Sequence, residues 1–438
     1  MVLLAIKKQK LPVFLTGCLI LLLVVTITIL SSNKVPVKNT HQSNTEDTVL
    51  SLHRHAHKVK GCYVILIRNS ELDGIASTMA QVEDTFNSKF DYPYVFLNDE
   101  PFTDHFKSTV ASLTKARVLF GLLDSAMWGY PDFIDQEYAA KCRESMTELG
   151  IPYASSESYR HMCRFVLRHN MQGASDTASC DFRFQSGFFF RHPLLDEFDY
   201  YWRLEPYVDY YCQIDYDVFK FMKDNKKKYG FTIAYKEHIE TVPTLWKTVM
   251  SFLEKYPDIS KQLPSRNESL IDFVTDDGGQ SYNTCHFWSN FEVGDLSLWR
   301  SEAYLKLFDY LDRSGGFFYE RYALNTHLLH AAKSNERHRW GDAPVHSIAA
   351  AILLKKSEFH FFNDIGYRHT SYTHCPVGDV FRTKCSCDPN NNFDFNMELS
   401  CYPKYKAAMH PSYKRLFDKM LPVADHQDLA TSSTANVY

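Results

Sequence analysis

Four segments combine acidic or histidine side chains with aromatic ones, and they are the parts of this sequence best suited to chemistry. They are Tyr201–Asp217, Tyr282–Asp295, Trp340–Ser347 and Asn363–His369. Carboxylates and imidazoles can hold a divalent cation that neutralises the diphosphate of a nucleotide-sugar and keeps coordination positions open for phosphate oxygens. The segments are therefore compatible with a metal-dependent transferase, but the residues alone favour solvated or paired acids.

Two acidic sites compete for the role of metal ligand in the first segment. Asp215-Tyr216-Asp217 is a D-x-D tripeptide, whose alternating carboxylates can point to one side of an extended or turning chain. Glu205 ends a strand-like run, and Pro206 interrupts that run so that the carboxylate can face a cleft. Because the chain has 52 acidic residues, such tripeptides are common, and the residues alone leave both sites open.

The elements that position these segments begin with a strand–helix–strand unit. Gly61–Asn69 is a β-branched run, Glu71–Phe86 has apolar residues at helical spacing, and Tyr94–Leu97 is the next strand. This order predicts an α/β fold with a parallel sheet and places ligands at the carboxyl ends of the strands, which includes the loop that starts at Arg68 and Asn69. The loop lacks a G-x-G-x-x-G or P-loop motif, so neither nucleotide fingerprint is predicted.

Further elements are predicted later in the chain. Phe231–Tyr235 and Glu358–Phe362 have strand composition, and Thr241–Lys255 and Pro344–Leu354 have helix composition. Residues 421–438 have the composition of a frayed tail. With 45% apolar residues and a formal charge of -4, the chain should fold and offers no basic excess for nucleic acid, so we expect no nucleic-acid partner.

The N-terminal part predicts a membrane anchor. Leu11–Leu30 is uncharged over 20 residues, long enough to cross a bilayer as a helix. A cleaved signal peptide is the alternative, but its apolar region is typically about 7 to 15 residues and ends in a small-residue cleavage site. Three lysines within residues 1–10 predict a cytosolic N-terminus and type II topology. Residues 31–60 are polar and read as a stem.

The cysteines suggest an oxidising compartment. Ten of the 11 follow the predicted span, among them the cluster Cys375, Cys385, Cys387 and Cys401. The topology favours disulfides over a zinc site, since no paired C-x-x-C is present. The sequence Asn267-Glu268-Ser269 is an N-glycosylation sequon, which suits a surface loop of a secretory protein.

At this point several long phrases carry a family resemblance. They are YRHMCRF, SGFFFRHPLL, YYWRLEPYVDYYCQIDYDVF, YNTCHFWSNFEVGDLSLWRS, GGFFYER, WGDAPVHSIA and GYRHTSYTHCP. Their order resembles that of the fungal Golgi α-1,2-mannosyltransferases, the KTR-type family 15 glycosyltransferases, from about Cys62 to about Tyr405. The resemblance implies a GT-A-like single catalytic domain over residues 61–420 with a mixed, mainly parallel sheet. It also implies GDP-mannose as donor, Mn²⁺ as cofactor, and transfer with retention to mannose on N- or O-linked glycans of a glycoprotein or cell-wall mannoprotein.

The resemblance also assigns site residues by matching phrases. Glu205 and His369 look like the metal ligands, so Glu205 displaces the D-x-D acids from that role. Glu292 looks like the carboxylate on the sugar face, proposed in the family as a nucleophile. Tyr159 resembles an active-site tyrosine whose hydroxyl can bind donor phosphate or acceptor.

Three further assignments concern substrate binding. Arg68 is expected to bind the nucleotide, and Trp288 and Asp342 to line the acceptor site. For each of them a structural role is the alternative: a surface arginine, a core tryptophan and a helix-capping aspartate.

Two stretches depart from the family pattern near the predicted site. Residues 166–184 separate MCRF from QSGFF, and residues 322–339 separate FFYER from WGDAPVHS. Insertion into a packed catalytic segment is hard to accommodate because catalytic groups need placement to about 1 Å. We interpret both stretches as retained introns, with surface loops that tune acceptor choice as the alternative. If the inserts disrupt the site, the chain would instead be a membrane-tethered pseudoenzyme that binds mannan or a partner.

Overall fold

The computed structural model describes residues 58–123, 132–138, 141, 182–319, 340–396, 398–410 and 412–413. The chain divides into two units, Met1–Lys58 and Val59–Tyr438. The predicted cytosolic tail, membrane span and C-terminal tail, and nearly all of the stem, lie outside the described residues. Within the described ranges, no helix is both long enough and apolar enough to span a bilayer.

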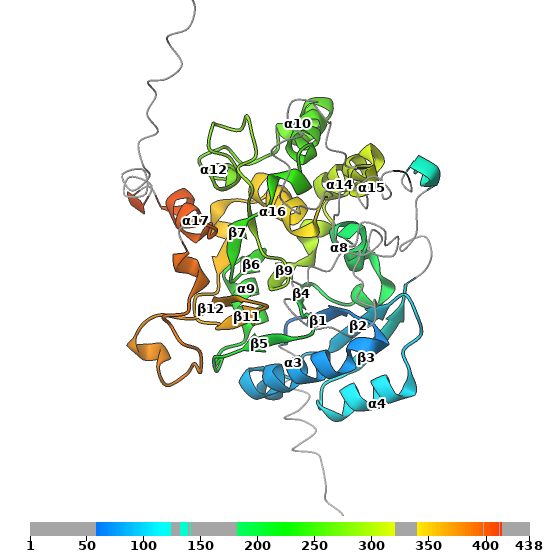
Figure 1. Ribbon diagram of the computed structural model, residues 1–438, viewed down its shortest axis with the longest axis vertical. Helices are drawn as coiled ribbons and strands as arrows, with labels where there is room; N and C mark the ends of the chain where they lie inside the picture. The colour runs from blue at the N-terminus through cyan, green and yellow to red at the C-terminus, as the bar shows by residue number, and fades with distance from the viewer. Residues whose placement is uncertain are drawn as a thin grey trace, which may run out of the picture. The chain divides into compact units, whose positions relative to one another are not determined.

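A seven-stranded sheet forms the centre of the second unit, in the order β10-β6-β9-β4-β1-β2-β3 (Figure 1). The strands are β1 Gly61–Leu66, β2 Tyr94–Asn98, β3 Val118–Leu122, β4 Tyr200–Arg203, β6 Tyr229–Phe231, β9 Glu292–Asp295 and β10 Phe359–Phe361. Strand β9 is antiparallel to both of its neighbours, β4 and β6, and the other pairs are parallel. The predicted mixed, mainly parallel α/β sheet is confirmed.

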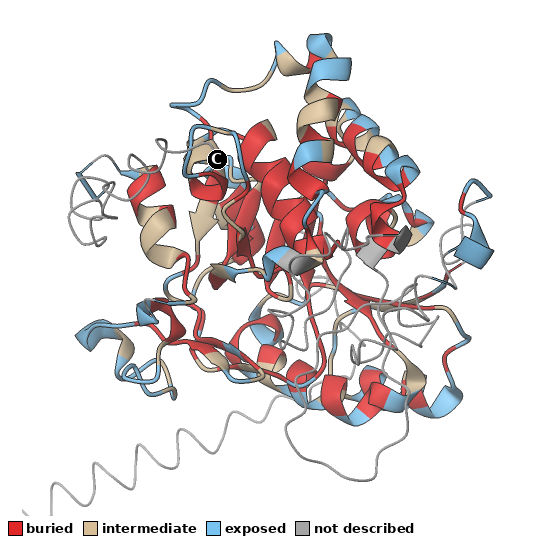
Figure 2. Cartoon of the chain, turned by 45° about the horizontal axis from the view of Figure 1, so that its top comes forward, coloured by how far each residue is buried: buried red, intermediate tan, exposed pale blue. Residues whose placement is uncertain are grey.

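Side chains alternate along the strands between two hydrophobic layers, as the period of two in a strand requires. On β1, Cys62 and Val64 belong to one layer, and Tyr63 and Ile65 to the other. The first layer includes helices α8 Phe182–Gly187, α10 Leu245–Lys255, α14 Glu302–Ser314 and α16 Asp342–Leu353. The second includes α3 Leu72–Thr85, α4 Asp104–Ser112 and α9 Val218–Asp224. Both faces of the sheet are therefore covered, and the inner strands β1, β2, β4, β6 and β9 and helix α16 are almost entirely buried (Figure 2).

Two smaller antiparallel sheets complete the architecture. The first joins β12 Tyr372–His374, β11 Tyr367–His369 and β5 Val208–Tyr210, and the second joins β7 Ala234–Lys236 and β8 Cys285–Phe287. Short helices connect these parts: α11 Pro257–Ser260, α12 Ile271–Val274, α13 Leu296–Trp299, α15 Gly316–Tyr319 and α17 Tyr402–Met409. The three-stranded sheet carries His369, one of the two predicted metal ligands.

Most of the predicted elements are confirmed, and one is wrong. Strands β1, β2 and β10 and helices α3, α10 and α16 lie where the sequence pattern predicts them. The predicted single strand Phe231–Tyr235 is instead split, since β6 ends at Phe231 in the central sheet and β7 begins at Ala234. The chain changes sheets between them to pair with β8, and strand composition alone does not show where a chain leaves a sheet.

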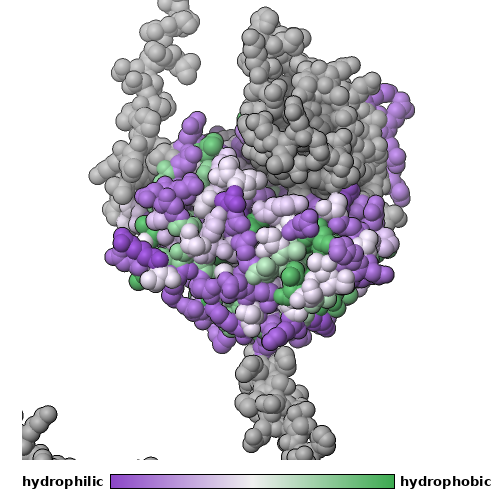
Figure 3. Space-filling model, turned by 60° about the horizontal axis from the view of Figure 1, so that its bottom comes forward, coloured by the Kyte–Doolittle hydropathy of each residue, from purple (hydrophilic) through white to green (hydrophobic). Residues whose placement is uncertain are grey.

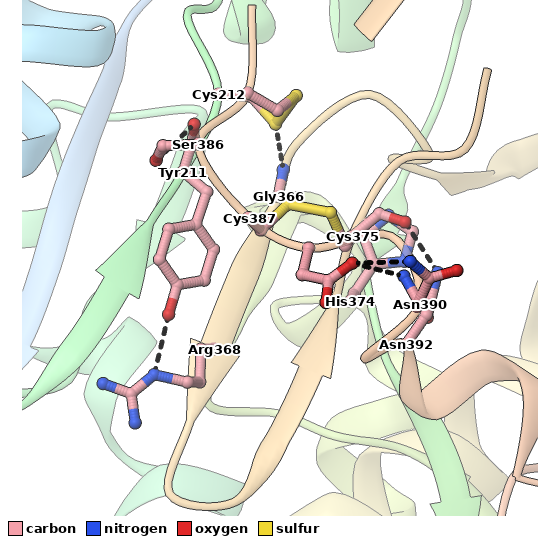
Figure 4. The surroundings of a disulfide bond; sticks show 12 residues. Tyr211, Cys212, Gly366, Arg368, His374, Cys375, Ser386, Cys387, Asn390 and Asn392 are labelled. Atoms are coloured by element: carbon pink, nitrogen blue, oxygen red, sulfur yellow. Dashed lines mark hydrogen bonds between the residues drawn. A yellow bond between two sulfur atoms is a disulfide. The ribbon is translucent and has the colours of Figure 1, made fainter. Parts of the chain in front are cut away.

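The expected disulfides are present. They join Cys212 to Cys385, Cys285 to Cys401 and Cys375 to Cys387. All four cysteines of the predicted cluster therefore take part in disulfides, while Cys62 on β1 is a buried free thiol. Figure 4 shows Cys212 beside Gly366, whose backbone N–H donates to Cys212 Sγ at 3.1 Å. The Cys212–Cys385 bond ties the loop after β12 to the chain after β5, Cys375–Cys387 closes part of that loop, and Cys285–Cys401 ties β8 to the start of α17.

The face drawn in Figure 3 is largely hydrophilic, with hydrophobic residues in small groups. The exposed large hydrophobic side chains are dispersed along the described chain, as Leu122, Tyr207 and Phe395 illustrate. Such dispersed residues are normal for a folded surface.

The start of α8 overlaps the first predicted insert. Phe184 is fully buried in the first layer, although it falls within residues 166–184. The dipeptide Arg164-Phe165 is repeated as Arg183-Phe184, so removing residues 164–182 leaves the same product as removing 166–184. Because Phe184 is part of the buried core, it favours placing the insert at residues 164–182, which leaves Phe184 in the chain. The rest of this insert and all of residues 322–339 lie outside the described residues.

Candidate active site

The candidate site lies at the carboxyl edge of the parallel strands. Arg68 and Asp99 follow the ends of β1 and β2, and Glu205 follows the end of β4. Because β9 runs antiparallel, its first residue, Glu292, lies opposite Arg203 at the end of β4. The sheet thus brings predicted residues from distant parts of the sequence to one edge, where α/β folds bind ligands.

Arg203 is the centre of a buried ion-pair network. Its Nη2 lies 2.7 Å and its Nε 2.8 Å from Glu205 Oε1, and its Nη1 donates to Asp342 Oδ2. Ser289 Oγ also donates to Asp342 Oδ2, at 2.9 Å. Burial by itself would lower the pKa of Arg203, but Asp342 and Glu205 together raise it. Arg203 therefore holds two of the predicted site acids, Glu205 and Asp342, in one cluster.

The pKa of Asp342 reflects the same network. Burial raises it, but the charges of Arg203 and His346 and the hydrogen bonds from Arg203 and Ser289 bring it below the ordinary value of 3.8. Asp342 is also the first residue of α16, where a negative charge interacts favourably with the helix dipole.

Glu292 is a buried carboxylate that accepts three hydrogen bonds. Tyr201 Oη donates to Oε1, Tyr229 Oη donates to Oε2 at 2.7 Å, and His346 Nδ1 lies 3.0 Å from Oε2. Only 1% of Glu292 is exposed. Burial raises its pKa, but the charge of His346 and the three hydrogen bonds outweigh burial and place the pKa below 4.5. The carboxylate is therefore kept ionised in an environment that would otherwise favour its acid form.

A glycine makes this arrangement possible. Gly294 on β9 lies in register with Tyr201 on β4 and with Tyr229 on β6. A Cβ atom at Gly294 would lie only 2.5 Å from Cε1 of the Tyr201 ring. Without a side chain between them, the two tyrosines lean over the strand and direct their hydroxyls to Glu292, two residues away on the same face.

His369 is held by an aromatic stack. Its ring packs on Trp288 with centroids 5.1 Å apart and an interplanar angle of 18°. It pairs across the small sheet with Val208, three residues after Glu205. Trp288 is followed by Ser289, which donates to Asp342. The predicted metal ligands and acceptor residues are thus connected through adjoining segments.

The donor set of Glu205 and His369 fits a divalent metal such as Mn²⁺. Both residues are 4% exposed, and a carboxylate with an imidazole is a ligand combination suited to this ion. Among the described residues there is no group of three or more His, Cys, Asp or Glu side chains that could hold a metal. A Glu–His pair leaves coordination positions for diphosphate oxygens and water.

The remaining predicted residues have different outcomes. Arg68 lies at the same edge, with Nη2 3.6 Å from Asp99 Oδ2. Burial raises the pKa of Asp99, and Arg68 opposes this effect. Tyr159 lies outside the described residues. Asp215 is exposed and pairs with Lys384 and Lys89, which agrees with its displacement as metal ligand by Glu205.

Sequence reasoning missed several residues that shape the site. They are Tyr201, Arg203, Tyr229, Ser289 and His346. Two signals could have found some of them. Tyr201, Arg203 and Glu205 recur with the period of a strand, and Asp342 and His346 are four residues apart on one helix face.

The chain belongs to the family described as glycolipid 2-alpha-mannosyltransferase, because the family model matches residues 27–174, 168–328 and 336–410. The predicted resemblance is therefore confirmed. The first two matched parts overlap at residues 168–174, which lie inside the first predicted insert. Residues 329–335 are not matched, and they lie inside the second predicted insert.

Named relatives share nearly half of the aligned sequence. Glycolipid 2-alpha-mannosyltransferase 1 of Candida albicans is 49% identical over 350 residues, 80% of this chain and 71% of the relative. Alpha-1,2 mannosyltransferase KTR1 of Saccharomyces cerevisiae is 47% identical over 348 residues, 79% of this chain and 78% of the relative.

Solved structures share the fold. Core-mannan synthase A of Aspergillus fumigatus, in its Mn/GDP form, has a TM-score of 0.67 and 37% identity, covering 81% of this chain and 86% of that chain. The mannosyltransferase Ktr4p of S. cerevisiae in complex with GDP has a TM-score of 0.67 and 33% identity, covering 90% of this chain and 98% of that chain.

Proposed function

We propose that this chain is an α-1,2-mannosyltransferase that transfers mannose from GDP-mannose to a mannose hydroxyl with retention of configuration. The observation that carries the proposal is the ionised, hydrogen-bonded Glu292 beside the Arg203-linked acids at the carboxyl edge, in a chain of this family. The named relatives are mannosyltransferases, and the solved neighbours are a Mn/GDP form and a complex with GDP. These names favour an enzyme over the pseudoenzyme alternative.

Residues at the edge divide the binding roles in a GT-A-like domain. Glu205 and His369 would hold Mn²⁺, which when bound neutralises charge on the diphosphate of the donor. Arg68, after β1, would bind the nucleotide. Trp288, which is 5% exposed and stacks on His369, and Asp342, which can accept hydrogen bonds from sugar hydroxyls, would line the acceptor site.

The reaction exchanges one bond at the anomeric carbon for another. The bond from that carbon to the phosphate oxygen breaks, and its electron pair leaves with GDP. A new bond forms to the acceptor oxygen, whose proton is released. Retention follows either two inversions through a glycosyl-carboxylate or attack on the same face as the leaving phosphate, which then accepts the proton. In both routes an ionised Glu292 stabilises positive charge on the sugar.

We also propose that the enzyme is a single-pass type II protein of the Golgi membrane, with glycoproteins as acceptors. The uncharged run Leu11–Leu30 and the lysines before it support the anchor. Three disulfides fit an oxidising lumen. The sequon residue Asn267 is exposed. Endoglycosidase treatment should change the gel mobility of the wild type but not that of the Asn267→Gln variant, and this result would support luminal orientation. An unglycosylated wild type would contradict it.

The test is transfer by the detergent-solubilised full chain, with GDP-mannose, Mn²⁺ and α-methyl mannoside. The expected product is an α-1,2-linked disaccharide. Glu205→Ala should abolish its formation, whereas Asp215→Asn, an exposed carboxylate of the D-x-D tripeptide, is the matched control and should retain it. Unchanged activity of Glu205→Ala would refute the metal assignment. GDP-mannose binding without transfer by a chain confirmed from cDNA would support the pseudoenzyme instead.

A further inference from the structure

Both ring nitrogens of His346 face oxygen atoms. Nδ1 lies 3.0 Å from Glu292 Oε2, and Nε2 lies 3.1 Å from the backbone carbonyl oxygen of Gln185. The residue is 1% exposed, so water does not compete for either contact. A carbonyl oxygen can only accept a hydrogen bond, and Nε2 must therefore carry a proton.

That constraint fixes the proton count of the His346–Glu292 pair. With Nε2 protonated, a neutral imidazole would direct the lone pair of Nδ1 at a carboxylate oxygen, which is repulsive. A second proton must therefore lie between Nδ1 and Oε2. Both oxygens of Glu292 already accept from tyrosine hydroxyls, and this favours the proton on the imidazole.

The tyrosine hydroxyl on the other oxygen is oriented in the same way. Trp299 Nε1 donates to Tyr201 Oη at 2.7 Å, so the proton of the Tyr201 hydroxyl is available to Glu292 Oε1. The indole also stacks on the His346 ring, with centroids 4.3 Å apart and an interplanar angle of 25°. Trp299 thus fixes the orientation of the imidazole and of the hydroxyl together.

We propose that His346 is a positioning residue that, as an imidazolium, keeps Glu292 ionised and fixes the direction of its carboxylate. The inference rests on the proposed function, in which Glu292 stabilises charge on the sugar. His346 acts through Glu292, and Asp342, one turn earlier on α16, is bound by Arg203. Helix α16 therefore contacts Glu292 through His346 and the Arg203 ion-pair network through Asp342.

Several charged or titratable groups surround the His346–Glu292 pair. Charged or titratable side chains face it from four elements: Tyr201 and Arg203 on β4, Tyr229 on β6, Tyr304 on α14 and Asp342 on α16. Burial and the Glu292 charge raise the pKa of each of these three tyrosines, and Arg203 and Asp342 form an ion pair. Without the shared proton, the pair would hold an uncompensated buried charge.

Two substitutions at His346 separate its two contacts. In His346→Asn the side-chain amide lies near the former Nδ1 and can donate to Glu292. In His346→Gln the amide reaches toward the Gln185 carbonyl and leaves Glu292 without its donor. We expect kcat to fall by about 10²-fold in His346→Gln and by less than about 10-fold in His346→Asn, with KM for GDP-mannose unchanged, because misplacing a catalytic group costs about this much.

His374 offers a matched control. Its Nδ1 lies 2.8 Å from Asp394 Oδ2 and its Nε2 3.2 Å from the Asn363 carbonyl, the same chemistry in another buried pair. His374→Gln should lower the melting temperature and leave kcat nearly unchanged. Equal losses of kcat in both His346 variants, or as large a loss in His374→Gln, would overturn the proposal.

A readout that needs no turnover tests the charge state directly. In ¹⁵N-histidine NMR spectra of the full chain at pH 7, assigned by comparison with His346→Asn, both nitrogens of His346 should carry protons. A neutral imidazole would overturn the proposal. Failure of the wild type to use GDP-mannose would refute the proposed function instead, and the NMR result would still decide the state of His346.

Discussion

Replacing Gly294 by alanine tests whether the tyrosine pair above it sets the geometry of Glu292. The new Cβ would lie 2.5 Å from Tyr201 Cε1, whereas ordinary contacts are 3.4–4 Å, so the ring must move by about 1 Å. Overpacking of this kind costs about 1–3 kcal/mol of unfolding free energy. A displacement of about 1 Å at a catalytic group lowers the rate by about 10²-fold. We therefore expect Gly294→Ala to fold with reduced stability and to lose about two orders of magnitude in kcat.

Gly61→Ala is the control for this substitution. Its Cβ would lie 2.6 Å from Cγ of Phe219, a similar clash with an aromatic ring. Gly61 begins β1, at the end of the strand opposite the site. Urea unfolding should show similar destabilisation of both variants, while the transfer assay should show near wild-type kcat only for Gly61→Ala. Wild-type kcat in Gly294→Ala, or an equal loss in Gly61→Ala, would refute the reasoning.

Three further predictions concern the charges and cross-links around the site. Arg203→Met leaves two buried carboxylates uncompensated and should lower the unfolding free energy by about 3–5 kcal/mol; a change below about 1 kcal/mol in urea unfolding would contradict the ion-pair network. The pKa of Glu292 in the folded state is below its ordinary value of 4.5, so its contribution to the free energy of unfolding is complete above pH 4.5 and is lost as the pH falls through the folded-state pKa. The free energy of unfolding should therefore fall less steeply with acid in Glu292→Gln than in the wild type, and an identical pH dependence would contradict this. The paired substitution Cys212→Ser with Cys385→Ser opens a loop of 173 residues and should cost about 2–5 kcal/mol in thermal or urea unfolding; unchanged stability would argue against the bond.

The elements that depend on local pattern could be predicted from the sequence. Strand β1, helix α3 and strand β2 follow from apolar spacing alone, and their order gives the parallel sheet and its ligand edge. The segment pattern also located the site, because Glu205, Glu292 and Asp342 lie in three of the four segments chosen for their chemistry and meet around Arg203.

What could not be predicted depends on long-range pairing. Nothing local shows that β9 runs antiparallel between β4 and β6, and only that register places Glu292 opposite Arg203. For the same reason Tyr201 and Tyr229 look like ordinary core aromatics until Gly294 aligns their hydroxyls. The disulfide partners were equally open, since several pairings of the same cysteines are compatible with one sequence.

The D-x-D tripeptide shows that a local motif can suggest a metal site where the residues have structural partners. Asp215 is exposed and pairs with lysines, and Asp217 caps the start of α9 by accepting from the backbone N–H of Lys220 at 3.0 Å. Both acids have structural partners at the surface. The buried Glu205 carries a weaker sequence signal but lies at the edge where the strands end.

The measurement that tests the central claim most directly is the GDP-mannose transfer assay on two versions of the chain, one complete and one lacking residues 164–182 and 322–339. With Mn²⁺ and α-methyl mannoside, the shortened version should form a disaccharide that NMR shows to be α-1,2-linked, and chelation of the metal should stop its formation. If both versions bind GDP but neither forms this product, or if the linkage formed is β, the proposed retaining α-1,2-mannosyltransferase is contradicted.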